Sequence, residues 1–144
     1  MARFRHITLA TRDPVKTADF YKKCFGLQEL FRQPKDTGEE GVWLTDGYIF
    51  FAVRQYGHGD IPSMGEGPST VEGVHHIGFD VDDIAETAAA CEGGGATACA
   101  NSHPPAYAVY KGPDGLVVDI VDKVWDKIIK AKTQLLHLEP APED

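Results

Sequence analysis

The chain has 144 residues, of which 42% are hydrophobic and 25% charged, as in one ordinary globular domain. Its formal net charge of −8 argues against general affinity for nucleic acid or anionic lipid, and its apolar stretches are too short to span a membrane. The N-terminus has no apolar signal-peptide core, so we expect a cytoplasmic protein.

The first predicted elements are a strand around His6 and a helix from about Pro14 to Cys24. Asp13 is a typical helix cap, and Gly26 is a typical residue at which a helix ends. A turn at Asp46-Gly47 then predicts a β-hairpin. The first part of the chain therefore has the order βαβββ.

The same order of elements returns after a constant offset of 70 residues. The matching pairs are His6 with His76, Asp13 with Asp83, and Thr17 with Thr87. The hairpins match at an offset of 68, which places Phe51 opposite Asp119. A repeat present only twice predicts a pseudo-symmetric domain and excludes a solenoid.

We expect a single domain over residues 1–123, with module one at 1–57, a Gly/Pro-rich linker at 58–73 and module two at 74–123. Residues 124–144 predict an amphipathic helix followed by a tail. The predicted fold class is α+β, with two βαβββ modules forming one curved mixed sheet and an added C-terminal helix.

Side-chain alternation turns residues of ligand type toward one face of the sheet. Apolar residues alternate with His6, His76 and Asp119 in their strands, so the apolar set can pack on the helices while these three face the other way. The same alternation places Arg5 and His75 on the helix side. Two imidazoles and a carboxylate suit a divalent cation with open positions, whereas a hydrogen-bonded, metal-free cluster is the alternative.

Three segments of the chain carry a family resemblance. They are His6-Ile7-Thr8-Leu9 with the helix that ends at Phe25-Gly26-Leu27, the stretch from Gly73 to Asp83, and the stretch from Gly112 to Ile120. Over about residues 3–123 the chain resembles the vicinal oxygen chelate superfamily, which includes glyoxalase I, methylmalonyl-CoA epimerase, extradiol dioxygenases and bleomycin resistance proteins. The resemblance implies a sheet curved around a metal cleft.

The resemblance also implies that the two histidines and Asp119 are the metal ligands, with Asp119 where the superfamily usually has Glu. At a fourth position glyoxalase I and the epimerase place Glu or Gln. The repeat places Phe51 there, and a register moved by one residue would place Phe50 or Ala52 there, none of which ligates. We therefore expect three protein ligands around Fe²⁺, with Mn²⁺, Ni²⁺, Co²⁺ or Zn²⁺ as alternatives.

The first functional hypothesis is an extradiol-type non-haem Fe(II) dioxygenase that binds a small oxygenated organic molecule through two vicinal oxygens. The metal would act as Lewis acid and template. The candidate catalytic acid/base residues are His103, Tyr107 and Tyr110, although none matches a position of the superfamily cleanly.

The second hypothesis is a glyoxalase- or epimerase-type lyase or isomerase that works through a metal-bound enediolate. This reaction needs a base, and Asp80 and His58 are the candidates. A fosfomycin-type transferase, to which Thr8 would correspond, ranks low because Lys111 is the only cation in the final segment before Asp119.

The third hypothesis is a non-catalytic, resistance-type binding protein with an aromatic pocket. Under any of the three, the candidate substrate-binding residues are Thr8, Phe51, Trp43 and Asp80. We expect no nucleic acid or membrane partner, and we expect a homodimer. The amphipathic segment after residue 123 suits either a subunit interface or packing within one chain, and the two modules could pair within a chain or between two.

Overall fold

The computed structural model describes residues 1–37, 40–56 and 72–136. Its elements in chain order are β1 (Arg3–Ala10), α1 (Pro14–Phe25), β2 (Gln28–Gln33), the 3₁₀ turn η1 (Lys35–Thr37), β3 (Gly41–Thr45), β4 (Phe50–Arg54), β5 (Gly73–Asp80), α2 (Ile84–Gly93), β6 (Thr97–Ala98), β7 (Ala108–Lys111), β8 (Val117–Val121) and α3 (Val124–Leu135). The two βαβββ modules and the C-terminal helix predicted from the sequence are confirmed. Most of the predicted linker and the tail after residue 136 lie outside the described residues.

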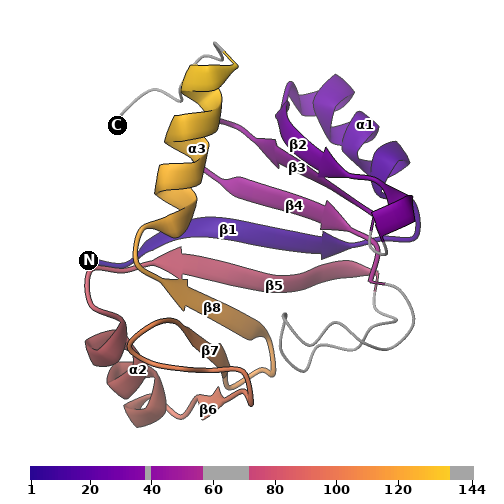
Figure 1. The fold of residues 1–144 in the computed structure, drawn as a ribbon. Helices are drawn as coiled ribbons and strands as arrows, with labels where there is room; N and C mark the ends of the chain where they lie inside the picture. The colour runs from indigo at the N-terminus through magenta and orange to yellow at the C-terminus, as the bar shows by residue number, and fades with distance from the viewer. Residues whose placement is uncertain (38–39, 57–71, 137–144) are drawn as a thin grey trace.

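The eight strands form one mixed sheet in the order β2-β3-β4-β1-β5-β8-β7-β6 (Figure 1). Within each module the first strand pairs in parallel with the last, β1 with β4 and β5 with β8. The antiparallel pair β1–β5 joins the modules at the centre of the sheet, so the modules pair within one chain. The first strands of both modules are therefore neighbours, and the repeat-equivalent residues that they carry lie close together.

The helices begin and end where the sequence predicts. The Asp13 side chain accepts a hydrogen bond from the backbone N–H of Lys16 over 3.0 Å, and Asp83 caps α2 in the same way through Glu86 over 2.9 Å. Gly26 takes the left-handed conformation, with φ of 70°, that ends α1. These local signals explain why both modules start alike.

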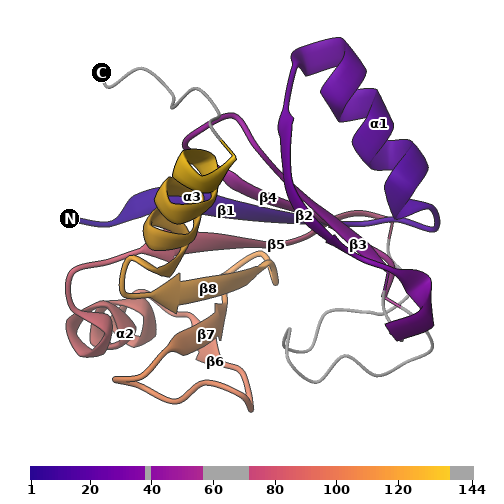
Figure 2. The ribbon, with the colours of Figure 1, turned by 45° about the horizontal axis from the view of Figure 1, so that its top comes forward.

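One face of the sheet is covered by α1 and α2, and the other by α3 (Figures 1 and 2). The apolar residues of β3 and β4 pack against α1, and those of β5, β7 and β8 against α2. Helix α3 instead packs Trp125 and Ile129 against Leu30 and Phe50. Among the described residues, no helix is both apolar enough and long enough to cross a membrane. The face that carries α3 is the one toward which the ligand-type residues point.

Candidate metal centre

Three neighbouring strands bring His6, His76 and Asp119 together on the α3 face of the sheet. Their potential ligand atoms all lie within 4.8 Å of one another. His6 Nε2 lies 3.1 Å from His76 Nε2, and that atom lies 3.3 Å from Asp119 Oδ2. We call these three residues the triad. His76 is fully buried, and the Asp119 side chain is 17% exposed, so the carboxylate is the part of the triad nearest to solvent.

Hydrogen bonds orient both rings so that the Nε2 atoms converge. His6 Nδ1 donates its N–H to the carbonyl oxygen of Phe50 over 2.7 Å, which leaves a lone pair on Nε2 of the neutral ring. His76 Nδ1 is bonded to Nδ1 of His75 over 2.9 Å. The Thr8 hydroxyl lies 3.0 Å from both Nε2 atoms, but it has one proton and can satisfy one lone pair only.

Burial shifts the pKa values of all three triad residues toward their neutral forms. Burial is the largest cause that lowers the pKa of His6 to about 4 and that of His76 to about 2, so both rings are neutral near pH 7. Burial, which takes water away from the carboxylate, also raises the pKa of Asp119 to about 7. Two lone pairs and a poorly compensated carboxylate thus point at one spot.

The donor atoms fit a divalent metal ion. Two ligands about 2.1 Å from one ion and at right angles lie about 3.0 Å apart. The separations of 3.1 Å between the two Nε2 atoms and 3.3 Å between His76 and Asp119 are close to this value, and His6 and Asp119 offer ligand atoms within 4.8 Å of each other. The positive charge of a bound cation would also stabilise the buried, ionised carboxylate of Asp119.

Residues 3–120 match the pattern of the glyoxalase/bleomycin resistance protein/dioxygenase superfamily. The chain belongs to this superfamily. No curated protein sequence matches it. Members of the superfamily commonly use divalent metals, which agrees with the donor set of the triad.

Solved structures support the superfamily fold. A hypothetical protein from Bacillus halodurans C-125 is 16% identical, with a TM-score of 0.58, covering 85% of this chain and 94% of that one. A variant of Streptomyces coelicolor methylmalonyl-CoA epimerase in complex with 2-nitronate-propionyl-CoA is 20% identical, with a TM-score of 0.55 and coverages of 83% and 96%. A mutant 4-hydroxymandelate synthase from Streptomyces coelicolor is 18% identical, with a TM-score of 0.65 and coverages of 84% and 37%. At these identities the likeness shows the fold alone.

The sheet register corrects the alignment of the two superfamily modules by one residue. In module one His6 pairs with Phe50, and in module two His76 pairs with Val117. The equivalent of Asp119 is therefore Ala52, at an offset of 67. Alanine cannot ligate, so the expectation of three protein ligands is unchanged.

Phe51 lies on the other face of the sheet. Its ring packs edge-on against Tyr21 of α1, with 5.1 Å between the ring centroids, inside the core between α1 and the sheet. The sequence named Phe51 as a substrate-binding candidate, but the structure places it away from the triad.

A pair of β-bulges corrects the predicted direction of two side chains. The β1–β5 register shifts between Phe4 and His6 and again between Thr8 and Leu9, so Arg5 and His75 are each an extra, unpaired residue. A bulge re-aims the side chain that it inserts. The prediction that both residues face the helix layer is wrong, since His75 bonds to His76 and Arg5 bonds to α3.

Helix α3 closes one side of the triad with an aromatic ring. Trp125 stacks on the His6 ring with 4.6 Å between centroids and 18° between planes. It lies so close to the sheet that a Cβ atom at Gly78 would stand 2.3 Å from the indole. Only glycine therefore lets α3 dock at this depth.

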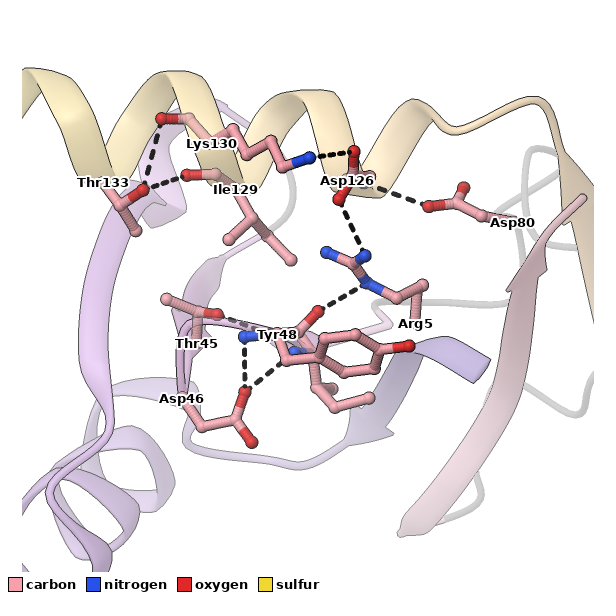
Figure 3. Close-up of polar contacts among 10 residues, drawn as sticks. Arg5, Thr45, Asp46, Tyr48, Asp80, Asp126, Ile129, Lys130 and Thr133 are labelled. Carbon is pink, nitrogen blue, oxygen red and sulfur yellow. Dashed lines mark hydrogen bonds and ion pairs between the residues drawn. The ribbon is translucent and has the colours of Figure 1, made fainter. Parts of the chain in front are cut away.

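Polar contacts fix α3 in this position (Figure 3). Asp80 accepts a hydrogen bond from the backbone N–H of Asp126 over 3.0 Å. The buried Arg5 pairs with the Asp126 carboxylate at 2.8 Å and donates to the Tyr48 carbonyl at 2.7 Å. Asp80, which the sequence named as a substrate-binding residue and as a candidate base, thus bonds to the start of α3.

The three predicted acid/base residues do not contact the triad. Tyr110 is buried on the α2 side, where its hydroxyl donates to Glu92 over 2.8 Å. Burial and this carboxylate raise the pKa of Tyr110 to about 12, so it stays protonated. His103 and Tyr107 are exposed and pack edge to face against each other, with centroids 5.6 Å apart.

Proposed function

We propose that this protein is a divalent-metal-dependent enzyme that binds a small oxygenated molecule through two vicinal oxygens at the triad. We further propose that it is an extradiol-type dioxygenase with Fe²⁺. Two histidines and one carboxylate with open positions are the donor set of non-haem Fe(II) oxygenases. The observation that carries the proposal is the convergence of the triad beside Ala52, where a fourth ligand would otherwise stand.

A bound ferrous ion would supply Lewis-acid and redox chemistry that no side chain has. His6 and His76 would hold it through Nε2, because their Nδ1 atoms are already bonded to Phe50 and His75. Asp119 would reduce its charge by one unit. Trp125 keeps water away from the His6 side, where contacts strengthen as the local dielectric falls.

The donor set of the triad ranks this proposal above the lyase or isomerase alternative, which also needs a base to remove a C–H proton. Asp80 already bonds to the first turn of α3, and Nδ1 of His75 is bonded to His76. His58, the other candidate base, lies outside the described residues. The fold likeness to methylmalonyl-CoA epimerase keeps the alternative as the second candidate, and a metal-free binding protein is the third.

The test is to purify the protein anaerobically, measure its metals, reload it with Fe²⁺ and follow oxygen uptake with catechols. Oxygen consumption with appearance of a coloured ring-cleavage product supports the dioxygenase. Exchange of a substrate C–H proton for deuterium without oxygen uptake, with nickel, cobalt or zinc bound, supports the lyase or isomerase. Tight ligand binding by a metal-free protein supports the third candidate and overturns the first two.

Two smaller parts of the proposal have separate tests. We propose Fe²⁺ ahead of Mn²⁺, Ni²⁺, Co²⁺ and Zn²⁺, and comparing activity after reloading with each ion orders them. We also propose a homodimer, which sedimentation equilibrium tests directly. All three triad residues come from one chain.

A further inference from the structure

Arg54 lies on the same face of the sheet as the triad. It ends β4 and pairs with Ala10 of β1, two residues along from the pair Thr8–Ala52 and four residues along from the pair His6–Phe50 on that face. Side chains two residues apart point the same way, so Arg54 follows Phe50 and Ala52 toward the end of β4 that is farther from Trp125. The small side chain of Ala52 stands between them.

Aromatic rings position the guanidinium. The Arg54 Cζ atom lies 5.3 Å from the ring centroid of Trp43 and 5.3 Å from that of Tyr56. Both rings are themselves fixed, since Trp43 stacks on Phe31 at 4.8 Å and Tyr56 stacks on His75 at 4.2 Å. Contacts of this kind favour arginine, whose planar cation packs on aromatic faces.

Gly41 has no side chain, which allows the Trp43 ring to lie beside Arg54. A Cβ atom there would stand 2.7 Å from the Trp43 ring and 3.4 Å from Cγ of Arg54. A larger residue would displace Trp43 and with it one of the rings beside the guanidinium.

The Arg54 guanidinium carries a positive charge on the same face of the sheet as the triad. Oxyanions are the groups that a guanidinium binds at two points through charge-assisted hydrogen bonds.

We propose that Arg54 binds an anionic group of the substrate, a carboxylate or similar oxyanion, whose vicinal oxygens face the triad. This inference rests on the proposed function and adds the substrate class to it. Guanidinium has five N–H donors, enough to bind an oxyanion at two points while it keeps another partner. Trp125 closes the opposite side, so the anionic end of a ligand points toward Arg54.

The experiment measures ligand binding to the Co²⁺-loaded protein, without turnover, from changes in the cobalt absorption. The probes are catechol, protocatechuate and 2,3-dihydroxybenzoate. The last two add a carboxylate at two different distances from the diol. The variants are Arg54→Gln and Arg54→Lys, and Arg12→Gln is the matched control because the Arg12 side chain is 88% exposed. Cobalt stoichiometry and the melting temperature of the metal-free protein show whether each variant folds and loads.

In the wild type, at least one carboxylated probe should bind about tenfold or more tightly than catechol, the effect of a charge-assisted bidentate contact. Arg54→Gln should abolish this preference and leave catechol affinity and cobalt loading within about twofold, Arg54→Lys should retain part of it, and Arg12→Gln all of it. An unchanged preference in Arg54→Gln, or no preference in the wild type while catechol binds, overturns the inference alone. Failure of catechol to bind the loaded wild type overturns the proposed function and this inference with it.

Discussion

Arg5 and His75 occupy the same place in the two modules, and each is an extra residue in a β-bulge just before a histidine of the triad. The backbone conformation is repeated in both modules, but the two side chains make different contacts. Arg5 bonds to Asp126 and Tyr48 and thereby holds α3 against the sheet. His75 bonds to His76 and stacks on Tyr56.

The same bulge therefore has a different role in each module. In module one the Arg5 bulge holds α3, which places Trp125 on His6. In module two the His75 bulge orients the His76 ring through the bond between the two histidines. Variants of Arg5 should therefore lower mainly the stability of the fold, and variants of His75 mainly the affinity for metal. Variants of His6 and His76 should lower metal affinity to the same extent.

The largest effect should follow removal of either triad imidazole. His6→Ala and His76→Ala should each lower affinity for a divalent ion by more than about 100-fold, beyond the loss typical of a residue that only supports a ligand. Metal content after equilibrium dialysis measures this. His103→Ala is the matched control because His103 is exposed and contacts Tyr107. Metal retention equal to the control in either triad variant would contradict the metal centre.

His75→Phe should lower metal affinity by about 10- to 100-fold, because the ring of His76 loses the bond that orients it. Phenylalanine keeps a ring to stack on Tyr56, so the metal-free protein should stay folded. Competition with a chromophoric chelator gives the affinity, and circular dichroism gives the fold. Wild-type affinity in this variant would show that the bond between the two histidines has no supporting role.

Arg5→Met should lower the free energy of unfolding by at least about 2 kcal/mol, since it removes two hydrogen bonds of a charged group and one such bond contributes about 1.5–3 kcal/mol. Metal affinity should stay within about twofold, because Arg5 contacts α3 and not the triad. Urea denaturation of the metal-free protein measures the first quantity, with Arg12→Met as the exposed control. A fall in metal affinity like that of His75→Phe would remove the distinction between the bulges.

Over a single pH unit, the smallest effect should be a pH dependence carried by Asp119. Its pKa of about 7 means that a metal must displace a proton below pH 7, so affinity should fall about tenfold for each pH unit from 7 toward 5 and stay level above 7. His6 and His76, with pKa values of about 4 and 2, are already neutral in this range and add no slope. Isothermal titration at several pH values tests this. Asp119→Asn should bind weakly without this slope, and a slope of the same size in that variant would assign it to another group.

The fold could be predicted from the sequence because its signals are local and occur twice. Helix caps at Asp13 and Asp83 and the 70-residue offset fix the order of the elements. Strand alternation also brought His6 and His76 to one face, since a period of two needs no knowledge of the neighbours.

The bulges, the register and the docking of α3 could not be predicted in this way. A bulge adds one residue without changing composition, so alternation assigned Arg5 and His75 to the wrong face. The hairpins were matched at an offset of 68 residues, whereas the strand pairing gives an offset of 67 and makes Ala52 equivalent to Asp119. Trp125 lies in a pattern that fitted intrachain packing and a subunit interface equally well, and the contacts of α3 with Gly78, His6 and Asp80 show that it packs on its own chain.

The position of Trp125 also bears on the handedness of any ligand. The indole lies on one side of the triad, and Arg54 lies toward the other end of β4. A molecule bound between them meets three unlike contacts: coordinating atoms, a flat apolar ring and a cation. Mirror-image molecules cannot match three different contacts in the same order, so a chiral ligand should be bound in one enantiomeric form in preference to the other.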